Sequence, residues 1–334
     1  MLNNLEIKNF GPLNEIVWNN LSQINLVIGP NDSGKTFLLK TLYSAMRTLE
    51  DYKRGDEPKK EAEILAEKLY WTFQPEKIGD LVKTGKTSLS CKITFDQQKF
   101  GYEFGKNTSK RISAIENDVN PRSSNSIFFP AKEVLSLDSI ILKSREQDKT
   151  FGFDDTYLDL VRALRQSSKS NNAEFTQARQ KLEEMLEGKV EYDNASGRWE
   201  FKKSNNRFSI GVTGEGIKNI AILDNLLGGQ YLDNKSIIFI DEPESALHPH
   251  AISQLLDIVA LLSECGIQFF LASHSYFVVK KFFLLAQEKK LSIPVMSANQ
   301  GEWQYADLKN EMPTNPIIDE SIRLYKEEVE LALQ

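Results

Sequence analysis

The octapeptide GPNDSGKT, Gly29 to Thr36, constrains the fold of this chain more than any other feature. It fits the pattern G-x-x-x-x-G-K-[ST], whose glycines let the backbone turn successive N–H groups toward an anion and whose lysine adds positive charge. The apolar run INLVI precedes it, and apolar residues recur at helical spacing from Leu38 to Leu49. Strand, loop and helix therefore follow in the order that a phosphate-binding loop requires.

This loop predicts a set of nucleotide contacts. Lys35 is expected to reach the β- and γ-phosphates of ATP, and the Thr36 hydroxyl is expected to bind Mg²⁺. A carboxylate at Asp32 is unfavourable beside phosphates unless it points to solvent or to a cation. Asp32 therefore predicts slow or partner-stimulated hydrolysis. The predicted nucleotide-binding residues of the loop are Gly29, Asn31, Ser33, Gly34, Lys35, Thr36 and Phe37.

A second motif, IIFIDEPESALHPH, supplies the acids for such a site. Four apolar residues place Asp241 at the end of a strand, where its carboxylate can hold Mg²⁺ directly or through water. Glu242 can orient or deprotonate the attacking water. The competing interpretation is a helix N-terminus whose dipole favours acids, and it suits Glu244 better than the Asp241 and Glu242 pair.

A third motif, LASHS, ends the next apolar strand and contains His274. A lone histidine is usually structural, but after the two preceding motifs a contact with the γ-phosphate or its attacking water is favoured. The predicted catalytic residues are Glu242, His274 and Lys35. The predicted metal ligands are Thr36 and Asp241.

In this order the motifs resemble the ATPase head of the ATP-binding-cassette class. GPNDSGKT is similar to the Walker A motif, IDEPE to Walker B, SALHP to the D-loop, and ASHS to the switch-histidine segment. The resemblance implies a homodimer in which each ATP is capped by the partner's signature loop. GVTGEGIKNIAILDNLL stands at the matching place, so Thr213, Gly214 and Gly216 are predicted to bind ATP. Glu215 stands where glycine is common, and a glycine turn that caps a helix is the alternative.

Other segments narrow the resemblance. LEIKNFGPL resembles the OLD, RecF-like and SMC-like heads more than transporter ATPases. The helical insert is too short for the long coiled coil of full SMC proteins, and the ~60 residues after His274 are too few for a Toprim nuclease domain. FFPAKEVLSL resembles a stretch of OLD-type defence ATPases, which implies that Lys132 and Glu133 lie near the nucleotide or near the site where the Q-loop glutamine works in other cassettes. No Q-loop glutamine is identified.

The expected fold is α/β: a P-loop NTPase of the ABC-ATPase type with a mixed, mainly parallel sheet, an antiparallel β subdomain and a helical lobe. We divide the chain into an N-terminal ATPase lobe (1–130), a helical insert lobe (131–205) and a C-terminal ATPase lobe (206–334). A helix is expected over 61–73, and a polar turn over 167–172 between two helices. The amphipathic tail, 317–333, is expected to pack back onto the fold.

Composition bounds the partners. A formal net charge of −6 does not indicate a basic nucleic-acid-binding domain. Two stretches are nevertheless locally basic, from Lys83 to Arg111 and from Arg198 to Arg207, and solvated hairpin faces are favoured over a nucleic-acid footprint. Cys91 and Cys265 lack disulfide or metal spacing. No signal peptide or membrane span is visible, so a cytoplasmic location is expected.

The sequence thus predicts a subunit that binds and hydrolyses ATP with Mg²⁺. Its ATP-driven dimerisation would control a separate effector, a nuclease or toxin, in antiphage defence. Three alternatives stay open: a DNA-repair head that binds nucleic acid, an ATP-stabilised scaffold that does not hydrolyse, and, less favoured, a transporter ATPase. His248 and His250 belong to the D-loop segment, so the three histidines do not indicate a metal triad.

Overall fold

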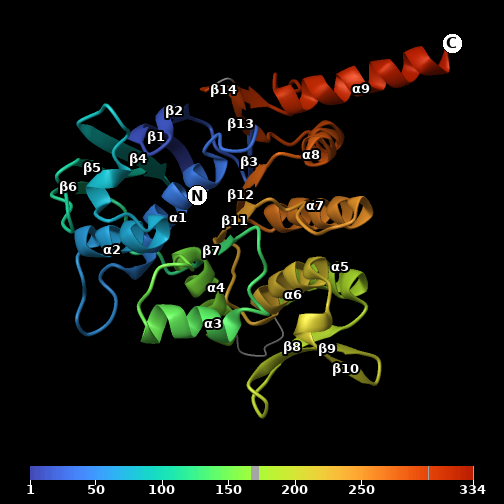
Figure 1. Cartoon of the computed structure of the whole chain (residues 1–334), viewed down its shortest axis with the longest axis horizontal. Helices are drawn as coiled ribbons and strands as arrows, with labels where there is room; N and C mark the ends of the chain where they lie inside the picture. Colours follow the sequence, from blue (N-terminus) through green and yellow to red (C-terminus); the bar gives the residue numbers. More distant parts are fainter. Residues whose placement is uncertain (167–172, 300, 334) are drawn as a thin grey trace.

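A six-stranded sheet runs through the middle of the computed structural model, which describes residues 1–166, 173–299 and 301–333 (Figure 1). Its strand order is β14-β13-β3-β12-β11-β7, and all neighbours are parallel except β14, which returns antiparallel along β13. Apolar runs such as INLVI suit it, because parallel strands are covered on both faces. The strands are β3 (Ile24–Ile28), β7 (Ser126–Phe129), β11 (Ile237–Asp241), β12 (Gln268–Ser273), β13 (Pro294–Asn299) and β14 (Glu302–Asp307).

The two faces of this sheet pack into two separate apolar cores. Val27 and Phe270 face α1 (Lys35–Asp51) and α2 (Glu61–Phe73), the latter with the bounds expected from the sequence. Leu26 and Phe269 point the other way, because side chains alternate along a strand. The helices on that second face are α4 (Asp155–Gln166), α5 (Thr176–Leu186), α6 (Glu215–Gly228), α7 (Pro249–Glu264) and α8 (Tyr276–Lys289).

A five-stranded antiparallel sheet covers α1 from the outside, in the order β2-β1-β4-β5-β6. Its last strand starts at Ala114, three residues later than the segment RISAI suggested. A short 3-10 helix, η1 (Ile78–Leu81), precedes β4. The strands are β1 (Leu2–Phe10), β2 (Leu13–Trp18), β4 (Ser88–Phe95), β5 (Gln98–Gly105) and β6 (Ala114–Asn117).

The insert between β7 and α6 holds both helices and strands. α3 (Asp138–Leu142), a π-helical turn η2 (Lys143–Gln147) and α4 come first, and η3 (Ala173–Phe175) leads into α5. A three-stranded antiparallel sheet follows, in the order β10-β9-β8, and η4 (Ile210–Val212) ends the insert. The polar turn expected over 167–172 lies outside the described residues. The strands are β8 (Lys189–Asp193), β9 (Arg198–Lys203) and β10 (Asn206–Ser209).

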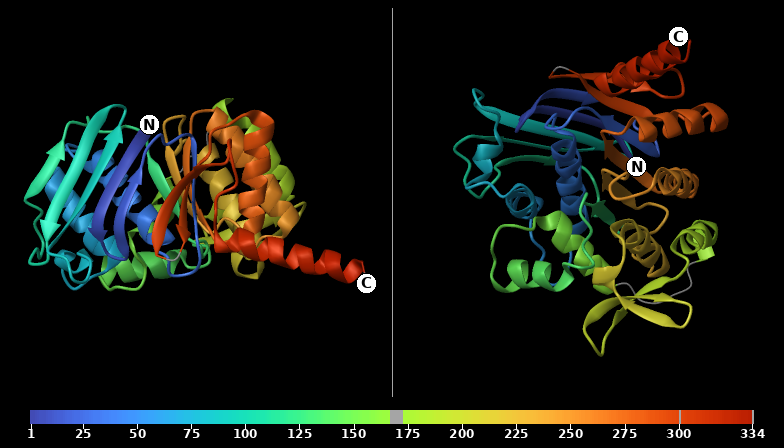
Figure 2. Two further views of the ribbon diagram at one scale, coloured as in Figure 1. Left: turned by 90° about the horizontal axis from the view of Figure 1, so that it is seen from above. Right: turned by 45° about the vertical axis from the view of Figure 1, so that its right-hand side comes forward.

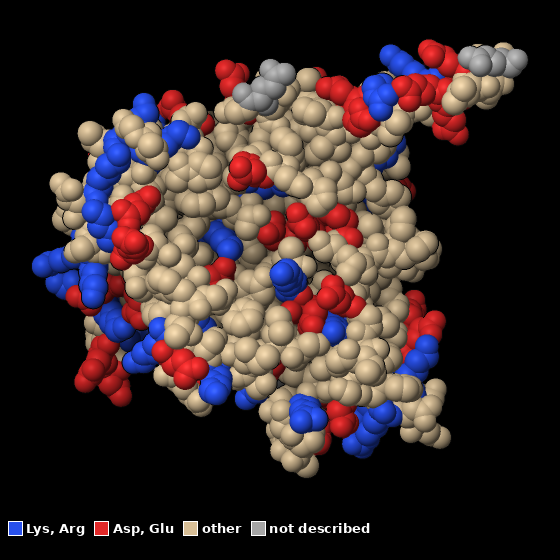
Figure 3. Space-filling view, viewed as in Figure 1, with Lys and Arg blue, Asp and Glu red and all other residues tan. Residues whose placement is uncertain are grey.

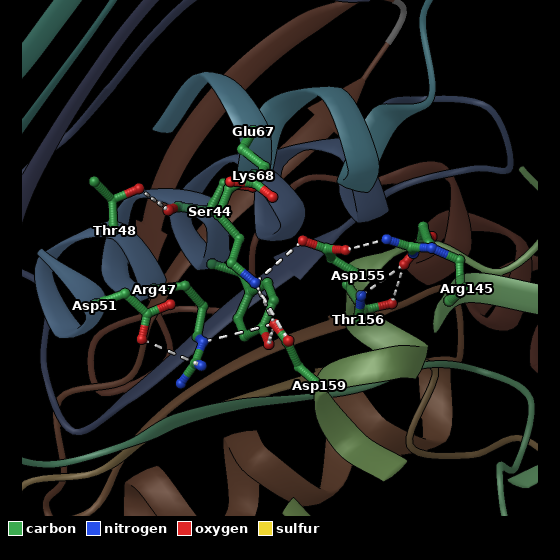
Figure 4. A network of polar contacts seen from close by, with 12 residues as sticks. Ser44, Arg47, Thr48, Asp51, Glu67, Lys68, Arg145, Asp155, Thr156 and Asp159 are labelled. Atoms are coloured by element: carbon green, nitrogen blue, oxygen red, sulfur yellow. Dashed lines mark hydrogen bonds and ion pairs between the residues drawn. The ribbon is translucent and has the colours of Figure 1, made fainter. Parts of the chain in front are cut away.

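A buried ion-pair network ties α1 and α2 to the insert (Figure 4). The Lys68 ammonium lies 3.1 Å from Asp155 and 2.9 Å from Asp159, both on α4. Arg47 of α1 lies 3.6 Å from Asp159, and Arg145 lies 2.6 Å from Asp155. Burial would raise the pKa of Asp159, but Lys68 and Arg47 hold it at about 2. The network therefore fixes α4 to the helix that follows the phosphate-binding loop.

The C-terminal helix, α9 (Pro316–Ala332), does not pack back as expected. Asn315 caps it by accepting the Ile317 N–H at 3.0 Å, and Pro316 occupies its first position. Ile318 is the one buried residue of α9, and the helix then projects past α8 away from the rest of the chain (Figures 1 and 2). The expectation was wrong because an amphipathic pattern predicts a helix with an apolar face, not what covers that face.

Candidate nucleotide site

Three parallel strands bring the sequence motifs to one edge of the central sheet. β12 pairs with β3 so that Ser273 lies opposite Ile28, and with β11 so that Ala272 lies opposite Asp241. The loop after β3, the DEPE turn after β11 and His274 after β12 therefore meet where these strands end. Ligands of open α/β sheets bind at this edge.

Glycine is required at both ends of the loop. Gly29 has φ 157° and Gly34 has φ 92°. A Cβ on Gly29 would lie 2.7 Å from the Ala298 Cβ, and one on Gly34 would lie 2.9 Å from Leu13 Cδ2. Asp32 is exposed and left-handed, with φ 61°, a conformation that aspartate adopts more readily than most residues. The backbone thus gives a local reason for an acid at this position.

The interior of the loop suits an anion. Lys35 is buried, and its ammonium donates to the Gly29 carbonyl at 2.9 Å and to the Pro30 carbonyl at 2.8 Å. Burial lowers the pKa of Lys35, and neighbouring carboxylates, Asp241 first, oppose that shift. The Ser33 hydroxyl is buried with no hydrogen-bond partner in the described part of the chain. A spare hydroxyl and an ammonium beside a helix N-terminus fit a phosphate.

Thr36 and Asp241 form a site that fits Mg²⁺. The Thr36 hydroxyl lies 2.9 Å from both carboxylate oxygens of Asp241. Burial raises the pKa of Asp241 to about 6, although the Thr36 hydroxyl opposes the shift. Among the described residues no group of three or more His, Cys, Asp and Glu could hold a metal. A magnesium site takes a few protein oxygens and is completed by water and substrate phosphates.

Glu242 and His274 contact each other beside this pair. Glu242 has a left-handed backbone, φ 53°, and its N–H donates to the Ala272 carbonyl at 2.8 Å. Its carboxylate lies 3.1 Å from His274 Nδ1 and accepts the Ser245 hydroxyl at 3.1 Å. The turn therefore points Glu242 toward the histidine, as a base and its orienting partner require.

Glu244 has a role that the sequence did not reveal. The expectation of an acid at a helix N-terminus was wrong, because α7 begins at Pro249 and its cap is His248. Glu244 instead accepts the Ser273 hydroxyl at 2.8 Å and the His274 N–H at 3.2 Å. The Glu244 carboxylate thus fastens the end of β12 to the turn after β11.

A pocket opens in front of the loop, and α2 forms part of its wall. Phe37, Thr72 and Phe73 line it with the loop and Glu242, and the rings of Phe37 and Phe73 lie 4.4 Å apart. Lys40 also lines it, with its ammonium 2.5 Å from Asp154. Phe37 was predicted from the sequence, but Lys40, Thr72 and Phe73 were not. Lys40 was detectable, one helical turn after Thr36, but no local pattern connects α2 to the loop.

The signature residues do not reach this pocket in their own chain. Thr213 is half-buried and Gly214 is exposed, just before α6, and neither belongs to the described lining of the pocket. Gly216 is buried against the D-loop segment, where a Cβ would lie 2.6 Å from Leu247 Cδ2 and 2.8 Å from the Ala246 carbonyl. Close packing therefore requires glycine at 216.

Lys132 and Glu133 do not line the pocket either. Lys132 is exposed, whereas Glu133 is buried and lies 3.0 Å from the Lys218 ammonium on α6. The same ammonium lies 2.7 Å from the Ser136 hydroxyl. Glu133 thus connects the segment after β7 to the helix that carries the signature.

Comparison with known protein families shows which family this chain belongs to. Residues 24–280, which include the loop, the signature, the DEPE turn and His274, match the family model described as "AAA domain, putative AbiEii toxin, Type IV TA system". The chain belongs to this AAA-domain family. No curated protein matches it.

Solved structures similar to this AAA-domain chain are ATPase heads. One is an SMC head bound to the C-terminal winged-helix domain of ScpA, with 14% identity, a TM-score of 0.56, and coverage of 92% of this chain and 97% of that one. Another, an Smc head from Pyrococcus furiosus, has 12% identity, a TM-score of 0.50 and 98% coverage of both chains. RecF is similar at 16% identity, covering 91% of this chain and 98% of that one, with a TM-score of 0.48. The two SMC heads share the fold of this chain, the ABC-type ATPase head.

Proposed function

We propose that this chain binds ATP with Mg²⁺, hydrolyses it, and uses the cycle to close and open a homodimer. The observation that supports this most is the convergence of Lys35, the Thr36 and Asp241 pair, and the Glu242 and His274 pair at one sheet edge. A structural helix terminus would need none of these acids. Membership of an AAA-domain family agrees with the proposal.

Each residue has a separate task in the proposed reaction. Lys35 exchanges its two carbonyl partners for phosphate oxygens, and Thr36 and Asp241 hold Mg²⁺. Bound Mg²⁺ neutralises phosphate charge. Glu242 orients the attacking water and takes its proton, while His274 holds the Glu242 carboxylate in position. Asp32 is exposed to solvent, where its carboxylate costs little, so this side chain no longer supports the expected slow or partner-stimulated turnover.

The proposed homodimer follows from the exposed signature. Gly214 is exposed and Thr213 half-buried, and the pocket is walled by the loop and α2 but by no signature residue among those described. A second copy that presents Thr213 and Gly214 to the bound ATP would complete the site. Gly216 supports that surface through its contact with the D-loop segment.

Glu242→Gln tests hydrolysis and dimerisation together. The amide keeps the shape but cannot take a proton, so we expect turnover to fall by at least ~10²-fold while ATP binding persists. An ATP-bound dimer should accumulate, measured by light scattering after size exclusion. The matched control is Glu302→Gln on β14, an exposed acid. Full turnover in Glu242→Gln would refute the assignment, and a wild type without ATPase activity under any condition would favour the scaffold alternative.

We further propose that the dimer controls a separately encoded effector, a nuclease or toxin, in cytoplasmic antiphage defence. The family description names a toxin and a type IV toxin–antitoxin system, and one similar head was solved bound to another protein. Both facts favour a partner over an isolated ATPase. Co-purification with the products of neighbouring reading frames, using the ATP-trapped Glu242→Gln form, tests this step. No helix in the described part of the chain is long and apolar enough to cross a membrane.

Nucleic-acid binding is a second candidate function, because one of the two basic stretches has cations without acidic partners. In the second stretch, Lys202 lies 2.5 Å from Glu191, Lys203 lies 2.5 Å from Glu187, and Arg207 lies 3.6 Å from Glu200. The cations of the first stretch form no ion pair with any described residue. Figure 3 shows Lys and Arg side chains gathered at the left edge, over the antiparallel sheet. A phosphate backbone would meet unpaired charge there.

A further inference from the structure

Helix α9 exposes a continuous apolar face. Ile322 is 46% exposed, Tyr325 65% and Val329 38%, although all three are large apolar side chains. Leu324 and Leu331 are also exposed, on another side of α9, and Leu333 is exposed just after its end. Contiguous exposed apolar surface of this kind marks an interaction site in a soluble protein.

The exposed residues follow the spacing with which one helix packs on another. Ile318, Ile322, Tyr325, Val329 and Ala332 are separated alternately by four and three residues, and we call these five residues the α9 seam. The seam starts in the fold, where Ile318 is buried, and continues outward on a rigid, capped helix ~25 Å long. Its far part lies ready for another helix.

The charges beside the seam indicate which helix fits. Asp319 and Lys326 lie seven residues apart on the same edge of the seam. Neither forms an ion pair in the described chain, whereas Arg323, on the opposite face, is paired with Glu320 and Glu327. An antiparallel copy of α9 brings Asp319 beside Lys326 of the second helix and repeats that pair by symmetry.

We propose that α9 pairs antiparallel with α9 of a second copy of this chain, seam against seam. Such a contact is self-complementary, as a two-fold interface requires. A lipid surface suits the helix less well, because its five acidic and two basic side chains give it a net charge of −3, and interfacial helices are rich in Lys and Arg.

This interface differs from the proposed ATP-dependent one. α9 leaves the fold beyond β13 and α8, at one end of the central sheet, whereas the insert and α6 lie toward β7 at the other end (Figure 1). Pairing of α9 therefore needs no nucleotide. Two different two-fold interfaces on one chain link more than two copies when both are occupied.

Sedimentation of the full chain without nucleotide, over a concentration series, tests the proposal. Wild type should form a dimer, and Tyr325→Asp should weaken its self-association at least about tenfold, because it places a charge in the middle of the seam. Tyr325 is exposed, so the variant should fold normally. Glu320→Gln, on the face of α9 opposite the seam, is the matched control and should dimerise like wild type.

A charge exchange checks the register. Asp319→Lys and Lys326→Asp should each weaken the dimer, and the double variant should restore it, which general stickiness of the helix would not do. With ATP, Glu242→Gln should give assemblies larger than a dimer, and Glu242→Gln with Tyr325→Asp a dimer. A wild type that is monomeric without nucleotide overturns the α9 pairing even if ATP still forms dimers. A nucleotide-free dimer that Tyr325→Asp does not weaken also overturns the α9 pairing. This holds even if a different protein is found to bind α9.

Discussion

Lys68 is the residue on which the contact between α2 and α4 depends most. Its ammonium is nearly buried and serves both Asp155 and Asp159. Lys68→Met would leave two buried carboxylates short of a cation, and we expect it to lower the free energy of unfolding at pH 7 by about 3–5 kcal/mol. Chemical denaturation measures this change. Lys59→Met, which breaks the exposed pair with Glu67, is the control and should cost at most about 1 kcal/mol.

The Lys68 effect should depend on pH in a defined direction. The pKa of Asp159 is about 2 in the folded chain and ~3.9 when unfolded, so its pairing stabilises the fold above the unfolded value. That contribution is lost as pH falls toward 2. The difference between Lys68→Met and wild type should therefore be full at neutral pH and shrink below ~pH 4. A difference that stays constant into acid would contradict the assigned role.

For single residues, the sequence predicted which side chains meet at the site, but not the backbone conformation or contacts that explain each one. The loop, Asp241, Glu242 and His274 meet as expected, because their motifs end adjacent parallel strands. Asp32 could be recognised only as a charge near phosphate, since its left-handed backbone is a property of the folded loop. Glu244 was misread because its partners, Ser273 and His274, are 29 and 30 residues away and no local pattern joins them.

Helix α6 depends on the buried pair of Glu133 and Lys218. Both side chains are 6% exposed, so Lys218→Met would strand the Glu133 carboxylate and should destabilise the chain by about 3–5 kcal/mol. Glu133→Gln with Lys218→Met removes both charges and should cost clearly less than the sum of the single changes. Thermal unfolding of the three variants checks this. Additive effects would show that the two groups act independently.

The sequence largely predicted where helices and strands occur, but not what each of them packs against. Apolar patterns located β3, α1 and β12, because burial sets the spacing of side chains along a strand or helix. The same periodicity correctly predicted that α9 is a helix, but wrongly predicted that it packs back onto the fold. The lobe expected to be helical also contains the sheet β8 to β10, of which the sequence indicated only a hairpin over Arg198 to Arg207. The short polar strand β8 carries too weak a pattern to be predicted.

At the scale of the whole molecule, the two basic stretches differ in whether their cations are paired with acidic side chains. Reversing Lys86, Lys106 and Lys110 to Glu should abolish any salt-dependent binding of duplex DNA, because these cations have no acidic partner in the described chain. Reversing Lys202, Lys203 and Arg207 should change binding little, since their charges are already paired. Fluorescence anisotropy across a salt series measures both. Absence of binding at low salt would reject the nucleic-acid candidate.

The strand order of the central sheet also determines when each part of the fold can form during synthesis. The antiparallel sheet uses strands from the first 117 residues, so it can form while the rest of the chain is still on the ribosome. β3 is different: both of its neighbours, β12 and β13, begin at or after Gln268. The strand that leads into the phosphate-binding loop must wait for almost the entire chain, because long-range parallel pairing is slow and forms late. ATP therefore meets a finished pocket only after β12 and β13 have been made, and a product that stops before β12 cannot take part in the proposed cycle.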